Sequence, residues 1–262
     1  MTTVDGVVAW VSGRSIGVSD VDALEAELRA GPVAATLPRV GTGEGRQLRR
    51  WLVQVLVAER LVAAEARARG LGDGPDLVEL APDRAALLGL GSVAADLLTR
   101  SAVARAVFVA VTADVVVEEE RVRRYYVANP EGFRVPERRV VRHAIAASAA
   151  PVDPAGRPLR TLRRGELAGR VEEALFAAAP GEVVGPVRDS LGWHTVQVVE
   201  VRPGRVRPFE EVRDEIAGRL LAAARRRAFT AWLDRHAVAE VRLAPGFEHP
   251  GDPGQPDNTH RH

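Results

Sequence analysis

The chain has 262 residues, of which 46% are hydrophobic and 27% charged, and its formal net charge at pH 7 is +1. These values are typical of one large or two modest globular domains, and a charge so near zero gives no electrostatic reason to expect nucleic-acid or membrane binding. Cysteine is absent, which excludes disulfides, thiolate metal sites and cysteine nucleophiles.

The N-terminal sequence gives no sign of export. The first ten residues, MTTVDGVVAW, lack the basic and long apolar regions of a secretion signal. No apolar run approaches the roughly 20 residues that span a bilayer. We therefore expect a cytoplasmic protein.

The first elements predicted are a hairpin and a helix. Residues 4–11 alternate weakly between apolar and polar types, which indicates a strand, and Ser12-Gly13 suits a turn before a return strand at 16–18. Ser19 suits the N-cap of a helix at 20–30, which Gly31-Pro32 would close.

Helical patterns then dominate as far as residue 128. The glycine-rich segment 40–46 predicts a loop, and apolar residues at helical spacing predict a long helix at 47–69 with Gly70 beyond its end. Residues 83–110 predict a helical region broken near 89–91, and Thr112 suits the N-cap of a helix that ends before Asn129.

Short strands and loops follow. The remaining elements predicted are a strand at 138–146, a loop at 149–158, a helix at 172–178, strand-like segments at 183–184, 186–187 and 193–201, a long helix at 208–236 and a last strand at 238–243. The Pro/Gly/Asp-rich tail from residue 245 predicts disorder.

Gly13-Arg14-Ser15-Ile16-Gly17 matches the G-x-S-x-G pattern of a serine nucleophile elbow. In an acyltransferase this elbow follows an α/β unit that supplies the oxyanion hole, whereas only about a dozen residues precede Ser15 here. We therefore favour a hairpin turn in which Ser15 faces solvent or starts the return strand.

The most informative segment is LRRGELAGRVEEALFAAAPGEVVGPVRDSLGWHTVQVVEVR, residues 162–202. It resembles the second half of a parvulin-type (PpiC-like) peptidyl-prolyl isomerase domain, and RRVVRHAIA (138–146) resembles the first strand of that domain. The resemblance implies that His143 and His194 are the two family histidines. The flanks VVAWVSGRSIGVSDVDAL (7–24) and VEEERVRRYYVANPEGFRVPERR (117–139) resemble SurA-like chaperones.

The chain also departs from the parvulin pattern. Where a parvulin has two helices and a loop carrying an acidic or thiol group, this chain has only SAAPVDPAGRPLRTL (148–162), so we expect that group to be missing. The residues that line the proline pocket fall on Leu167 and Val171, and the latter replaces a large aromatic side chain.

The two histidines have two interpretations. As catalytic residues, His143 and His194 would be a hydrogen-bonded pair on adjacent strands, with Leu167, Val171, Leu191 and Trp193 binding the substrate. As structural residues, they would tie the strands together, each satisfied by a neighbour. A metal site lacks a third ligand nearby, and we expect no metal and no cofactor.

The sequence therefore predicts an α+β fold with a SurA-like helical domain that includes terminal strands, plus a small, shortened parvulin-like α/β insert. The predicted parts are 1–133, helical; 134–203, parvulin-like; 204–244, a helix and strand returning to the helical domain; and 245–262, a disordered tail. Because SurA-like chains close this domain with both ends, we expect the first and last strands to pair.

The function predicted from this resemblance is that of a chaperone-type protein. It would bind an unfolded or extended polypeptide, with no nucleic-acid or membrane partner, and have weak peptidyl-prolyl isomerase activity at most. Two alternatives stay open: a fully active isomerase, and an acyltransferase of malonyl transferase type acting through Ser15.

Overall fold

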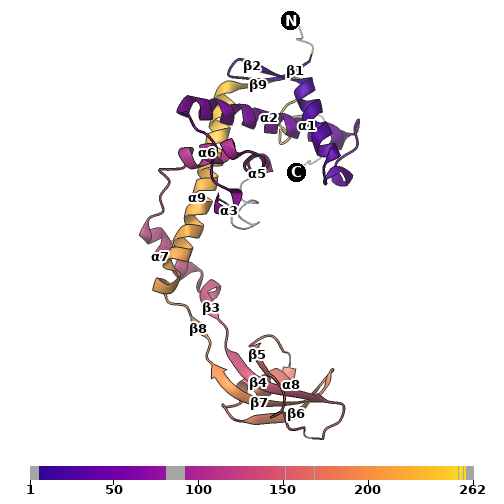
Figure 1. Cartoon of the computed structure of the whole chain (residues 1–262), viewed down its shortest axis with the longest axis vertical. Helices are drawn as coiled ribbons and strands as arrows, with labels where there is room; N and C mark the ends of the chain where they lie inside the picture. The colour runs from indigo at the N-terminus through magenta and orange to yellow at the C-terminus, as the bar shows by residue number, and fades with distance from the viewer. Residues whose placement is uncertain are drawn as a thin grey trace. The chain divides into compact units, whose positions relative to one another are not determined.

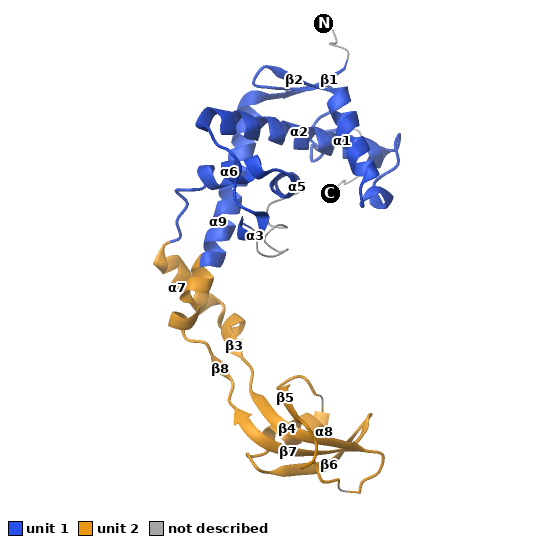
Figure 2. Cartoon of the chain, in the orientation of Figure 1, with its two compact units in different colours: residues 1–117, 218–262 blue, residues 118–217 orange. Residues whose placement is uncertain are grey.

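The computed structural model describes residues 6–80, 92–150, 152–167, 169–252, 254, 255 and 257. It divides into two compact units, one formed by 1–117 and 218–262 and the other by 118–217 (Figure 2). Helices and antiparallel strands occur together along the chain, so the predicted α+β class is confirmed (Figure 1). The domain boundaries drawn from the sequence stay a prediction.

Unit 1 contains a three-stranded antiparallel sheet that joins the two ends of the chain. Its strands lie in the order β2-β1-β9 and cover Arg14–Gly17, Val7–Val11 and Val241–Leu243. Ser12 and Gly13, both at positive φ, form the turn between β1 and β2. The predicted pairing of the first and last strands is confirmed, with Trp10 opposite Arg242.

Two helices of unit 1 begin earlier than predicted. Helix α1, Val18–Ala30, has Gly17 rather than Ser19 at its N-cap, because the Asp20 carboxylate accepts a hydrogen bond from the Gly17 N–H at 2.8 Å. Helix α2, Gly43–Arg69, takes in part of the predicted glycine loop, because the Thr42 hydroxyl caps it by accepting from Gly45 N. Gly70 ends α2 in the left-handed conformation, as predicted.

The next helices include a break at Ser101 that the sequence analysis did not predict. The described elements are η1, Ala34–Thr36; α3, Leu77–Leu80; α5, Ser92–Arg100; and α6, Ala102–Val111. Ser101 separates α5 from α6 by capping the latter, while the predicted break at 89–91 lies outside the described residues. Thr112 ends α6 instead of opening a helix, because its hydroxyl donates to the Phe108 carbonyl.

Helix α9, Phe209–Glu240, supplies residues to both units. Its second half packs against α2, α5 and α6 through Phe229, Trp232 and Leu233, and the Phe229 ring lies 5.3 Å from that of Phe108. The helix continues through 238–240, where we predicted strand, and β9 follows directly.

Part of the segment beyond β9 contacts unit 1. Phe247 packs against the core formed by β1, β2, α1 and α2. The guanidinium groups of Arg46 and Arg50 both contact the Asp257 carboxylate, which holds the pKa of Asp257 well below its ordinary value. The composition of the tail did not predict these contacts.

Unit 2 begins with a small helical part and a short ribbon. These elements are α7, Glu119–Ala128; η2, Pro130–Phe133; and the paired strands β3, Arg134–Val135, and β8, Arg205–Val206. The Tyr126 ring packs against Phe133 and Phe209, and its hydroxyl donates to the Arg207 carbonyl at 2.8 Å.

The main sheet of unit 2 has four antiparallel strands in the order β5-β4-β7-β6. The strands are β4, Arg138–Ala146; β5, Leu159–Arg163; β6, Val183–Asp189; and β7, Gly192–Arg202. Helix α8, Gly169–Ala177, covers one face through Leu175 and Phe176. The sequence predicted β4 at its observed bounds but missed β5, which lies at the end of the short connecting segment.

A buried arginine fastens α8 to this sheet. Arg139 on β4 is 6% exposed, donates to the Phe176 carbonyl at 2.6 Å and to the Ala178 carbonyl, and contacts Glu137 at 2.6 Å. The two carbonyls belong to the C-terminal end of α8, where the helix leaves acceptors without intrahelical partners. One side chain therefore satisfies the helix end and links it to β4.

Within the described ranges, no helix is both long and apolar enough to cross a membrane.

Removing this arginine should destabilise unit 2. Arg139→Met leaves two buried carbonyls without donors, so we expect the free energy of unfolding to fall by about 3–5 kcal/mol. Hydrogen exchange at the amides of β4 and β7 measures this loss. Arg163→Met is the matched control, since its ion pair with Glu166 is exposed and should contribute no more than about 1 kcal/mol. Equal losses of unfolding free energy in both variants would show that Arg139 does not stabilise the end of α8.

Candidate functional site

The pairing of β4 with β7 sets the positions of the two histidines. His143 lies opposite Val196, and His194 lies opposite Ile145, so the two are diagonal neighbours on antiparallel strands. Because side chains alternate along a strand, both rings point to the same face of the sheet, and diagonal neighbours are within reach of aromatic side chains.

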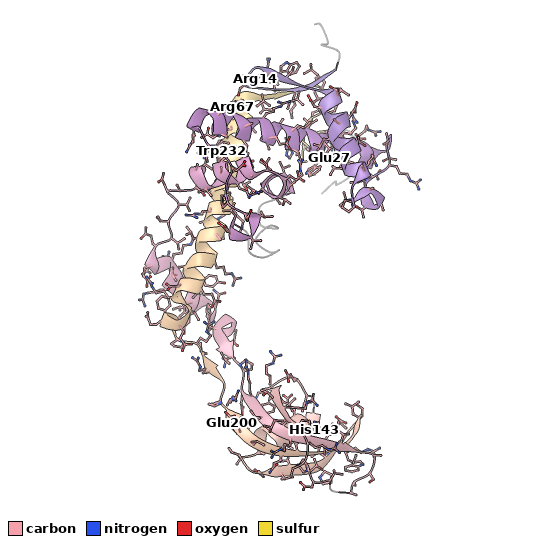
Figure 3. All side chains as sticks on the ribbon, viewed as in Figure 1. Arg14, Glu27, Arg67, His143, Glu200 and Trp232 are labelled. Carbon is pink, nitrogen blue, oxygen red and sulfur yellow. The ribbon has the colours of Figure 1, made fainter. Side chains whose placement is uncertain are left out.

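The two imidazole rings form the hydrogen-bonded pair that the sequence predicted. Nε2 of His143 lies 2.8 Å from Nδ1 of His194, and the ring centroids are 4.9 Å apart with 29° between the planes. His194 is only 2% exposed, whereas His143, labelled on the sheet in Figure 3, is half-buried. His143 is therefore the member of the pair that solvent reaches.

A close backbone approach holds His194 in place. β6 and β7 change register between Val184 and Val187, and Gly185 lies in this irregularity at a φ of +113°. A Cβ atom there would lie 2.2 Å from the His194 carbonyl oxygen. Only glycine allows β6 to run this close to the backbone of His194.

An acidic side chain completes the group, which corrects the expectation that the acid is missing. Asp189 ends β6, and its Oδ1 lies 2.7 Å from Nε2 of His194. The same oxygen accepts a hydrogen bond from the Leu191 N–H at 2.7 Å in the turn between β6 and β7. The carboxylate therefore comes from a hairpin and not from the loop in which parvulins carry it.

Sequence reasoning missed Asp189 although the signal was present. Asp189 and Gly192 pair across a two-residue turn, which places Val187 opposite His194. Because side chains alternate along a strand, Asp189, two residues after Val187, lies on the histidine face. Ile145 was missed in the same way: it lies opposite His194, two residues after His143, and is 47% exposed.

The surroundings favour a neutral His143 and an ionised Asp189. Burial, followed by the proximity of His194 and Arg160, lowers the pKa of His143, against a weaker opposing effect of Asp189. For Asp189, desolvation acts to raise the pKa, but the hydrogen bonds from Leu191 N and His194 outweigh it and the net pKa is lowered.

The four predicted substrate-binding residues differ in burial and in the face of the sheet on which they lie. Val171 is buried, and Leu167 packs against the core of unit 2. Trp193 precedes His194 on β7, so its side chain points to the opposite face, where it contacts Arg188. Leu191 lies in the turn and is 75% exposed. Trp193 therefore does not share a face with His194, and the substrate-binding role of the other three residues stays a prediction.

Ser15 lies in a regular strand. It is exposed on β2, opposite Trp10. A nucleophile elbow needs a sharp turn from a strand directly into a helix, and here the turn precedes Ser15 and a strand contains it. The predicted solvent-facing position on the return strand is confirmed.

Among the residues that the structure describes, no group of three or more His, Cys, Asp or Glu side chains has the arrangement of a metal site. His260 and His262, in the sequence HRH at the C-terminus, lie outside the described residues.

Comparisons with known proteins agree with the resemblance. Residues 149–214 match the family model of the PPIC-type PPIase (peptidyl-prolyl isomerase) domain, and residues 7–44 match a family of unknown function (DUF7158). The chain is 35% identical over 107 residues to the chaperone SurA of Nitrosospira multiformis. The aligned region covers 40% of this chain and 23% of that protein. The chain thus spans less than a quarter of the length of this relative.

Solved structures show weaker likenesses. One comes from a study of PEB4 and Cj1289, two SurA-like chaperones of Campylobacter jejuni. It is 16% identical to this chain, with 91% of this chain and 99% of that chain covered and a TM-score of 0.49. PrsA of Bacillus cereus is 14% identical, with 91% and 92% covered and a TM-score of 0.24. At these values they support no residue's role.

The PPIC-type match contains His194 and Asp189, and His143 lies just ahead of it. Together with the SurA match and the hydrogen-bonded histidines, it identifies the chain as a homologue of SurA chaperones that carries a PPIC-type peptidyl-prolyl isomerase region.

Proposed function

We propose that the protein binds unfolded or extended polypeptides and isomerises X-Pro bonds slowly at His143 and His194. The observation that carries this proposal is the hydrogen bond between His194, which lies within the PPIC-type region, and His143, which lies just ahead of it. A SurA relative supports the polypeptide as the class of partner. No observation favours acyl transfer through Ser15, which lies in a regular strand.

Isomerisation needs no cofactor and no covalent intermediate. The barrier of about 18–20 kcal/mol comes from amide resonance, which is lost when the X-Pro bond twists. The twisted amide has less charge separation than the planar one, so a drier, preorganised site favours it. His194 is buried and held by Asp189, and the more exposed His143 would contact the polypeptide.

The arrangement of the apolar side chains supports a slow reaction. Val171 and Leu167 lie in the core and Trp193 lies on the other face, so the proline ring gains little contact from them. Loss of one buried apolar contact weakens binding of the ring by about 1–3 kcal/mol. Each 1.4 kcal/mol lowers a rate about tenfold, and we expect activity at least a hundredfold below that of a complete parvulin.

Unit 1 offers a second surface that suits a polypeptide. A pocket of about 260 Å³ lies between α2, α5 and α9, with an apolar floor of Val57, Leu61 and Leu233. Nε2 of Gln54, at its wall, is buried and has no hydrogen-bond partner in the described part of the chain. A carbonyl oxygen of a bound polypeptide would satisfy this amide while an apolar side chain fills the floor.

The isomerase proposal predicts a slow rate that depends on His143. With a proline-containing tetrapeptide, the wild-type chain should accelerate cis–trans exchange measurably, and His143→Ala should return the rate to the uncatalysed value. Exchange spectroscopy by NMR measures both rates. The half-buried position of His143 makes the variant tolerable to the fold. If wild type and variant had equal rates, the histidine pair would have no catalytic role.

Filling the pocket in unit 1 should weaken binding of a polypeptide. Ala237 lines the pocket, and Ala237→Trp should lower the affinity for a permanently unfolded, fluorescently labelled polypeptide about tenfold, because one apolar side chain loses its place. Fluorescence anisotropy measures the affinity. Val238→Trp is the control, since Val238 is 88% exposed on the same helix. Unchanged binding by Ala237→Trp would exclude the pocket.

The lowered pKa of His143 makes unit 2 less stable in acid. The folded state prefers the neutral ring, so below about pH 6.5 the unfolded state takes up the proton first, and stability falls with pH toward the lower folded pKa. The charged groups facing His143 are His194 on β7, Arg160 on β5 and Asp189 on β6.

Urea unfolding, followed by hydrogen exchange in β4 and β7, should show this loss between pH 7.5 and 5.5 in the wild type. It should be smaller in His143→Gln and unchanged in the exposed-histidine control His249→Gln. Carboxylates with lowered pKa values, such as Asp189, take up protons only at lower pH and so do not change the stability in this range. An equal loss in His143→Gln would show that another group is responsible.

A further inference from the structure

Asp189, His194 and His143 form a continuous chain of hydrogen bonds. Oδ1 of Asp189 lies 2.7 Å from Nε2 of His194, and Nδ1 of His194 lies 2.8 Å from Nε2 of His143. The chain runs from a turn through a nearly inaccessible ring to a half-buried one. Each atom in it has a fixed partner on a neighbouring strand.

The carboxylate decides which atoms carry the protons. An ionised carboxylate only accepts hydrogen bonds, so Nε2 of His194 must donate to Asp189. In a neutral imidazole the other nitrogen is then an acceptor, and Nδ1 of His194 accepts from Nε2 of His143. This leaves Nδ1 of His143 as an acceptor. A hydroxyl in place of Asp189 would not impose this direction, because it donates as well as accepts.

We propose that Asp189 is a positioning residue that fixes the proton arrangement of both histidines, so that Nδ1 of His143 is an acceptor for an N–H of a bound polypeptide. The consequence for the rate rests on the proposed isomerase function, whereas the proton arrangement does not. Asp189 touches only His194 and its own turn, and acts on the polypeptide through the two rings.

The two roles of Asp189 can be separated because one oxygen serves both. Oδ1 accepts from Leu191 N in the turn and from His194. In Asp189→Ser a hydroxyl oxygen can still accept from Leu191 N and keep the turn, while it can either donate to His194 or accept from it, so the proton direction is no longer imposed. In Asp189→Ala the turn acceptor is lost as well. A purely structural role predicts a normal histidine pair in the Ser variant.

The test uses the full chain labelled with ¹⁵N at histidine and two measurements. Two-bond ¹H–¹⁵N spectra give the tautomer of each ring, and NMR exchange rates with the tetrapeptide give kcat and KM. We expect the Nε2–H tautomer for both rings in the wild type and a mixture of tautomers in Asp189→Ser. We also expect kcat to fall about tenfold with little change in KM.

Asp153→Ser is the matched control. Asp153 accepts from Ala155 N at 2.9 Å in a similar turn of unit 2, and it is not hydrogen-bonded to a histidine. It should leave both tautomers and kcat unchanged. Unchanged histidine tautomers in Asp189→Ser would overturn the inference. Altered tautomers in a chain with no isomerase rate, even as wild type, would support the positioning role and refute the proposed catalysis.

Discussion

The site depends on the antiparallel pairing of β4 with β7, which extends from Arg138 opposite Arg202 to Ala146 opposite Trp193. This register places Arg139, Val141, His143 and Ile145 along one face of β4. Arg139 fastens the end of α8, Val141 lies in the core, and His143 meets His194. A slip of one residue would turn this whole row to the other face.

The hairpin between β6 and β7 makes a second contribution to the same face. It returns the chain so tightly that Asp189, five residues before His194, contacts its ring. The short segment between β4 and α8 has no room for the helices and loop of a parvulin, and it forms β5 instead. The carboxylate is therefore supplied by the opposite edge of the sheet.

Much of unit 2 could be predicted because its patterns are local. The alternation of apolar and polar residues predicted β4, and the resemblance of the segment ending in GWH to parvulins predicted the histidine pair. What failed depended on neighbours in space. Trp193 was assigned to a pocket by analogy, but it lies on the far side of β7 from His194. Predicting the contact of Asp189 with His194 required the register of the β6–β7 hairpin, which a single sequence does not show directly.

The central claim is that a polypeptide meets the histidine pair at a proline. It can be tested by titrating the ¹⁵N-histidine-labelled chain with an unstructured peptide containing one X-Pro bond and with the same peptide carrying alanine instead. The account predicts that the ring signals of His143 and His194 shift on addition of the proline peptide and much less with the alanine peptide. Equal shifts with both peptides, or shifts confined to His236 and His249 in unit 1, would contradict it.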